Sequence, residues 1–281
     1  MVLTALTLEA HVANGQAGSG GGGDYVARMA HAHAAETPVA NASAIQPNVD
    51  VTGEEVTYGT LNGNPLRGYL AYPTAPSKKP LPGVVVIHEW WGLNDNIRAA
   101  ARRLAGEGYT VLAVDLYGGK SATNPDSARQ LMQSVAGNSE GALANVHAAN
   151  TYLRSTRHAR KVGTLGWCFG GGWSLRAALF DADHVDAAVV YYGEPDLDLT
   201  HLSQLRAPLL GLYGGADQGI PVDKVRGMQG ILDSLGKNVT IKIYEGAKHA
   251  FANPSGPAYD PGPADDAWQL TIQFLAKNLK K

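Results

Sequence analysis

The chain has 281 residues and a formal net charge of −2, from 23 basic and 25 acidic side chains. Its basic residues are scattered along the chain, which argues against a nucleic-acid partner, and no apolar run approaches the ~20 residues that span a bilayer. The single cysteine excludes an internal disulfide and a zinc site built from several cysteines, so the redox compartment cannot be read from it. We expect no cofactor, no membrane partner and no nucleic acid.

Residues 1–53 differ in composition from the rest of the chain. They contain the run GSGGGG at 18–23, an alanine-rich stretch and few large apolar residues with a clear period. We expect a flexible or loosely docked extension, in which His31 and His33 are solvated rather than metal ligands. The apolar start lacks basic residues, so it resembles at most the remnant of a signal peptide. Localisation therefore stays open between the cytoplasm and the periplasm or exterior.

The remainder, residues 54–281, has the pattern of one α/β domain. Two alternating runs flank Asn62-Gly63, which predicts an antiparallel hairpin. Six apolar runs, typical of strands buried on both faces, follow at 83–89, 110–116, 162–168, 186–193, 208–217 and 239–246. Segments with helical period lie between them. Strands that alternate with helices predict a mostly parallel sheet covered by helices on both faces, with ligands at the carboxyl ends of the strands.

Cys168 lies at one of these carboxyl ends. The segment GWCFGGG at 166–172 follows a buried strand and precedes a helix, which is the context of a nucleophile elbow with cysteine in place of serine. Side chains at 166, 170 and 171 would collide with neighbouring strands in such a sharp turn. The helix start also favours a thiolate at this position. The alternative is that Cys168 is an inert, small core residue.

An elbow nucleophile needs an acid and then a histidine later in the chain. Asp217 and His249 each follow a predicted strand and occur in that order. Glu194 and Asp196 leave the strand at 186–193 and compete with Asp217 as the orienting acid.

Ser139 lies in GNSEG at 137–141, which fits the usual serine elbow pattern. The segment before it is helical rather than extended, so we expect Ser139 to cap the next helix instead.

With these residues in place, the sequence resembles the dienelactone hydrolase family of the α/β-hydrolase superfamily, from about residue 55 to the C-terminus. The segments VVVIHEWWGLN, VDLYGG, GGADQGIP and YEGAKHAFAN carry the resemblance. It implies an α/β-hydrolase fold and a modulating role for Glu89, whose carboxylate would hold the resting thiol until substrate displaces it; the alternative is that Glu89 only pairs with His88 or an arginine. The fold also implies an oxyanion hole formed by the backbone amides of Trp90 and Phe169.

The resemblance is weaker around the expected substrate. Arg129, Trp91 and Phe251 are candidates for substrate binding, whereas Asn253 stands where the family's best-known members have an arginine that grips a carboxylate. We therefore expect hydrolysis of a small ester or lactone through Cys168, Asp217 and His249, by a monomer or a small homo-oligomer. A general carboxylesterase or thioesterase, and more distantly a non-catalytic binding protein, remain alternatives.

Overall fold

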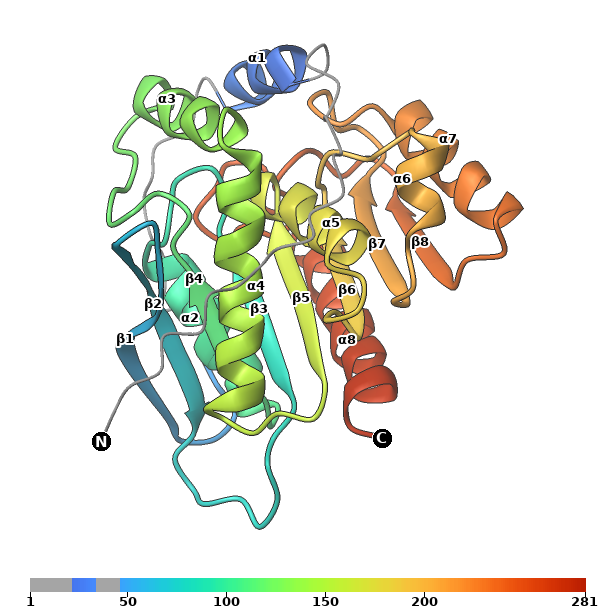
Figure 1. Cartoon of the computed structure of the whole chain (residues 1–281). Coiled ribbons are helices and arrows are strands. Elements are labelled where there is room, and N and C mark those ends of the chain that lie inside the picture. Colours follow the sequence, from blue (N-terminus) through green and yellow to red (C-terminus); the bar gives the residue numbers. More distant parts are fainter. Residues whose placement is uncertain (1–21, 34–45) are drawn as a thin grey trace.

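A computed structural model describes residues 22–33 and 46–281, which include one eight-stranded sheet in the order β1-β2-β4-β3-β5-β6-β7-β8 (Figure 1). The strands are β1 Val51–Leu61, β2 Asn64–Pro73, β3 Gly83–Ile87, β4 Thr110–Val114, β5 Val162–Trp167, β6 Ala187–Tyr191, β7 Leu209–Gly214 and β8 Val239–Tyr244. The helices are α1 Gly22–Ala32, α2 Asp95–Gly106, α3 Pro125–Ala136, α4 Ser139–Ser155, α5 Phe169–Phe180, α6 Leu199–Ser203, α7 Val222–Ser234 and α8 Pro261–Leu279.

The hairpin at the start of the domain is confirmed. β1 and β2 pair in antiparallel register, and Leu61 faces Asn64 across the turn. Asn62 and Gly63 have φ angles of 51° and 80°, which is the left-handed backbone that a two-residue hairpin turn requires and that these residues tolerate. β2 then pairs antiparallel with β4, so the hairpin is continuous with the main sheet.

From β4 to β8 the sheet is parallel, as predicted. Every residue of β3, β4, β5, β6 and β7 is buried, because these strands have neighbours on both sides and helices on both faces. β8 differs: its residues alternate between half-buried and exposed before the buried Tyr244. The expectation that residues 239–246 are buried on both faces is wrong, because β8 forms the edge of the sheet.

Helices cover both faces of the sheet. α4 and α5 pack against the central strands on one face, in front of the sheet in Figure 1. α2 and α8 share the opposite face, where the Arg103 guanidinium lies 4.1 Å from the centre of the Trp268 ring. The layered architecture is that of the α/β-hydrolase fold. The carboxyl ends of the parallel strands all lie at one end of the sheet, and α1 and α3 lie at this same end.

The glycines at the turn between β5 and α5 are required by close backbone contacts. A methyl group at Gly170 would lie 2.5 Å from the carbonyl oxygen of His88 and closer still to that of Ile87. Both oxygens belong to the backbone, at the last residue of β3 and the residue after it, and backbone cannot move aside as a flexible side chain could. The predicted collisions with the backbone next to neighbouring strands are confirmed at 170 and 171, whereas a methyl group at Gly166 would meet the backbone of Gly170 and Gly171 at the start of α5.

We therefore expect Gly170→Ala to lower the free energy of unfolding by more than about 3 kcal/mol, because overpacking against backbone is not relieved by a rotamer change. Gly230→Ala is a matched control. Gly230 lies in the interior of α7 with open space around it, so alanine there should stabilise by about 0.5–1 kcal/mol. Thermal unfolding of both variants measures the difference, and equal melting temperatures would contradict this account of the turn.

Most of the predicted extension, residues 1–21 and 34–45, lies outside the described residues, and the division of the chain at residue 53 stays a prediction. Within that segment, residues 22–32 form α1, which packs against α3. The side chains of Val26 and Met29 are buried.

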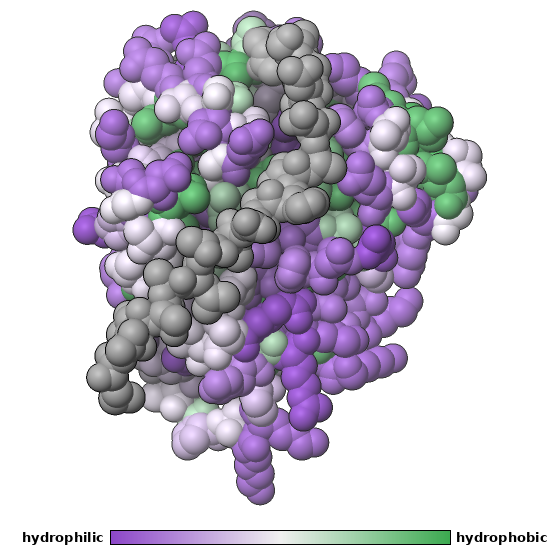
Figure 2. Space-filling model, in the orientation of Figure 1, coloured by the Kyte–Doolittle hydropathy of each residue, from purple (hydrophilic) through white to green (hydrophobic). Residues whose placement is uncertain are grey.

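The surface in Figure 2 is mainly hydrophilic, and hydrophobic side chains gather chiefly over the region of α6 and α7. Leu197 and Leu199, next to and within α6, are among the exposed large apolar residues. In the described part of the chain, no helix combines the length and apolar character needed to cross a membrane.

Candidate active site

Cys168 occupies the turn between β5 and α5, where its backbone has φ 54° and ψ −119°. A positive φ is uncommon for a residue with a side chain, and the turn is held because the Cys168 amide donates to the carbonyl of Tyr191 at 3.0 Å. A positive φ between a buried strand and a helix is the backbone geometry expected of a nucleophile elbow. The thiol itself is fully buried.

His249 and Asp217 form a buried pair. The loop after β8 carries His249, whose Nδ1 donates to Asp217 Oδ2 at 2.7 Å. Asp217 follows β7, and its other oxygen accepts hydrogen bonds from the amides of Gly219 and Ile220, both at 2.8 Å. These bonds fix the carboxylate, so that it holds the imidazole with Nε2 available.

The two competing carboxylates are engaged elsewhere. Glu194 accepts hydrogen bonds from Arg28 at 2.8 and 2.9 Å, and Asp196 lies 3.0 Å from His201 Nδ1. Asp217 is therefore the carboxylate that the structure brings to His249.

Cys168 and His249 influence each other's ionisation. Burial alone would raise the pKa of the Cys168 thiol, but the positive charge of His249, and then the hydrogen bond and charge of His33, lower it to about 6. Burial alone would lower the pKa of His249, but the Cys168 thiolate and the Asp217 carboxylate raise it well above its usual value. The arrangement favours a thiolate beside an imidazolium at neutral pH.

Glu89 follows β3 and is buried. Its carboxylate accepts a hydrogen bond from Asn253 Nδ2 at 2.8 Å and a longer one from the Tyr192 hydroxyl at 3.4 Å. Asn253, which the resemblance aligns with an arginine of the family's best-known members, thus contacts Glu89. The two ring nitrogens of the neighbouring His88 contact backbone groups, namely the Glu89 carbonyl at 2.6 Å and the Leu116 amide at 3.2 Å.

The two predicted oxyanion donors lie beside the turn. Phe169 is the first residue of α5, and Trp90 follows Glu89 in the loop after β3. Among the described residues, neither backbone amide has a hydrogen-bond acceptor. The indole Nε1 of Trp90 is also buried without a partner there. Free N–H groups around a nucleophile can stabilise negative charge on a bound substrate.

The structure adds His33 to this group, and sequence reasoning missed it. His33 Nε2 lies 3.6 Å from Cys168 Sγ, and its ring stacks on Trp90 with centroids 4.5 Å apart. Met29 Sδ also contacts Cys168 Sγ, at 3.7 Å. His31 is exposed as expected, but the expectation that His33 is solvated is wrong, because only 2% of it is exposed.

Arg28 holds α1 over the thiol. Its guanidinium donates to both oxygens of Glu194 and to the carbonyl of Gly219 at 2.9 Å, so it links α1 to the loops after β6 and β7. The Cys168 thiol has no exposed surface under this helix.

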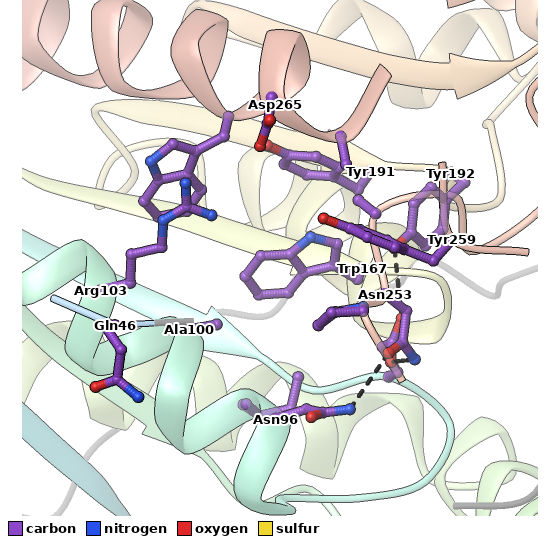
Figure 3. A pocket seen from close by; sticks show the side chains of 16 residues that line it. Gln46, Asn96, Ala100, Arg103, Trp167, Tyr191, Tyr192, Asn253, Tyr259 and Asp265 are labelled. Atoms are coloured by element: carbon purple, nitrogen blue, oxygen red, sulfur yellow. Dashed lines mark hydrogen bonds between the residues drawn. The ribbon is translucent and has the colours of Figure 1, made fainter. Parts of the chain in front are cut away.

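A cavity of about 350 Å³ lies beyond Glu89 and Tyr192, between α2 and α8. Figure 3 shows Arg103 and Gln46 at one end of it, and Asn253 and Tyr192 at the other. Its lining is Gln46, Glu89, Asn96, Ile97, Ala100, Arg103, Trp167, Tyr191, Tyr192, Ala252, Asn253, Pro254, Tyr259, Ala264, Asp265 and Trp268. Cys168 is not among the residues that line this cavity.

Trp91, Phe251 and Arg129, the three residues predicted to bind substrate, have different surroundings. Trp91 is buried and its ring lies 6.5 Å from that of His33, whereas Phe251 packs in the core against Tyr192. Arg129 is on the exposed side of α3, and its guanidinium lies 3.5 Å from Asp126.

Ser139, the alternative nucleophile, is the first residue of α4. The cap is its neighbour Asn138, which accepts from the Gly141 amide, so the predicted capping role is displaced by one residue.

Fold and site together define a hydrolase of the α/β-hydrolase class. Residues 66–279 match the model of the dienelactone hydrolase family, and the chain belongs to that family. It is 36% identical over 225 residues to the protein usf of Aquifex pyrophilus, covering 78% of this chain and 96% of the relative. It is 32% identical, with the same coverage, to an Aquifex aeolicus protein provisionally named a carboxymethylenebutenolidase.

The solved structures agree with this assignment. A Klebsiella pneumoniae crystal structure, provisionally named a dienelactone hydrolase, is 28% identical with a TM-score of 0.71. The match covers 81% of this chain and 99% of that one.

Proposed function

We propose that the chain hydrolyses a small ester or lactone through a covalent thioester on Cys168. The observation that supports this proposal most is the position of the Cys168 thiol at the strained turn, next to His249. His249 is the main cause of the lowered pKa of the thiol, and it is itself hydrogen-bonded to Asp217. The thiolate attacks the carbonyl carbon, and the amides of Trp90 and Phe169 stabilise the oxyanion. The His249 imidazolium gives its proton to the leaving alkoxide. His249 then takes a proton from water, which attacks the thioester and releases the acid and the thiol.

Glu89 has a supporting role in this proposal. A carboxylate next to a thiol disfavours the thiolate, and the resemblance to the family implies this role for Glu89. Its carboxylate is held by hydrogen bonds from Asn253 and Tyr192. Asn253 is neutral and cannot pair with a substrate carboxylate as an arginine does. This difference favours an ester or lactone without a carboxylate over dienelactone itself, and it keeps a general carboxylesterase or thioesterase as the second candidate.

A panel of probes tests the proposal: an unsaturated five-membered lactone, an aryl acetate and an acyl thioester of a small thiol. We expect turnover of at least one, with acylation of the Cys168 peptide visible by mass spectrometry when the reaction is quenched with acid. The relative kcat/KM values distinguish a lactonase from a general esterase. Turnover of none, or an acyl group on any other residue, would overturn the proposal.

The pH dependence of the reaction follows from the thiol. Because the pKa of Cys168 is lowered to about 6, the reactive thiolate is present above that pH and is lost as the pH falls through it. We expect kcat/KM to fall about tenfold for each pH unit below about 6, and the rate of alkylation by iodoacetamide to follow the same curve. A midpoint near that of an ordinary cysteine, about 8.5, would show that His249 does not stabilise the thiolate.

A further inference from the structure

The N-terminal segment places His33 beside Cys168 and His249, so that three side chains of the types that bind metal ions lie together. One donor atom from each of His33, Cys168 and His249 lies within 4.8 Å of the others, and all three residues are buried. They come from three distant parts of the chain: the end of α1, the turn before α5 and the loop after β8. We propose that these residues form a binding site for a thiophilic divalent cation such as Zn²⁺, with α1 supplying the third ligand.

The separation of the ligand atoms suits such an ion. Zinc binds thiolate sulfur at about 2.3 Å and imidazole nitrogen at about 2.0–2.1 Å in tetrahedral geometry, which places the two ligand atoms about 3.6 Å apart. The distance between Cys168 Sγ and His33 Nε2 is 3.6 Å. The third ligand is within the same small volume, so modest side-chain rotations complete three positions of a tetrahedron. The fourth position is left for water or an anion.

The state of His249 independently indicates a ligand. Its Nε2 is buried and has no hydrogen-bond partner in the described part of the chain, a condition that is costly for a polar atom. Its Nδ1 donates to Asp217. A carboxylate that orients the far nitrogen of a histidine is the usual outer contact of a zinc ligand. The same hydrogen bond that prepares His249 for hydrolysis thus also prepares it for a cation.

The site is assembled only when α1 is docked. Arg28 and the buried Met29 hold α1 in place, and His33 follows directly after the helix. A cation bound to all three residues would keep α1 over the thiol and occupy the sulfur lone pair. Inhibition by the cation rests on the proposed function, because it requires Cys168 to be the nucleophile. Starting from a thiolate and an imidazolium, binding releases one proton from His249 Nε2 to solvent.

Cobalt provides a spectroscopic test that does not depend on activity. The full chain, stripped with a chelator, is titrated with Co²⁺ in the absence of oxygen. We expect thiolate-to-cobalt absorption in the near ultraviolet and visible bands of tetrahedral intensity, saturating at one equivalent and abolished by Zn²⁺. His33→Ala should weaken Co²⁺ binding by more than about 100-fold, since the loss of an outer contact alone costs 10–100-fold. Wild-type protein without this absorption overturns the proposal.

His31→Ala is the matched control, because His31 is exposed and lies two residues away. It should bind Co²⁺ as the wild type does, and equal binding by His33→Ala would overturn the role of α1. If His33→Ala does not fold, His33→Gln repeats the comparison. Hydrolysis by the metal-free chain separates the two proposals. A cobalt spectrum without turnover of any ester supports the cation site and overturns the proposed hydrolysis by Cys168. Turnover without a cobalt spectrum supports the proposed hydrolysis and overturns the cation site.

Discussion

Cys168→Ala should lower kcat/KM for the best ester or lactone by roughly 10³-fold or more, since loss of a nucleophile removes the covalent route altogether. The fold should survive. The substitution removes one buried sulfur atom, so we expect a loss of about 1 kcal/mol in the free energy of unfolding. Steady-state kinetics and thermal unfolding of the same preparation separate the two effects.

Ser139→Ala is the matched control for the nucleophile, because Ser139 fits the serine motif but begins α4, with its hydroxyl donating to the carbonyl of Ala136. Its kcat/KM should stay within about twofold of the wild type, as expected for a surface position away from the chemistry. Full activity in Cys168→Ala would exclude the thioester mechanism. Inactivity of both Cys168→Ala and the wild type would favour the alternative of a binding protein.

The sheet could be predicted because its signals are local. Continuous apolar runs mark strands buried on both faces, and Asn62-Gly63 tolerates the left-handed backbone that the turn needs. The glycine at 170 could be predicted from the strand-to-helix motif, although the atoms that exclude a side chain there belong to Ile87 and His88, which are distant in the sequence. The chain order of Cys168, Asp217 and His249 adds the topology of the sheet to these local signals.

The parts that could not be predicted depend on contacts between distant segments. β8 is a different case: Val239, Ile241 and Ile243 alternate with Thr240 and Lys242, which is the pattern of a strand with one exposed face, and its interpretation as a continuous apolar run overlooked that alternation. α1 lies in an alanine- and glycine-rich stretch whose composition resembles that of a flexible segment. Its position depends on Arg28 finding Glu194, 166 residues away, and that pairing leaves no local pattern around His33.

Asp217→Asn should lower kcat/KM by about 10²–10⁴-fold with little change in stability. Asparagine has the same shape, and its side-chain oxygen can still accept from the amides of Gly219 and Ile220. What changes is the atom facing His249. A carboxylate oxygen accepts from Nδ1, whereas an amide NH₂ donates to it and so places the imidazole proton on Nε2.

A neutral imidazole with its proton on Nε2 can no longer take one from the thiol or from water at that atom. The Cys168 thiolate would lose its main stabilising charge, so the acidic limb of the kcat/KM profile should move to higher pH as well as fall in height. Asp196→Asn is the control, since Asp196 pairs with His201 instead, and it should leave the profile unchanged. An active Asp217→Asn together with an inactive Glu194→Gln would transfer the orienting role to Glu194, and the hydrogen bond from His249 to Asp217 would then be structural only.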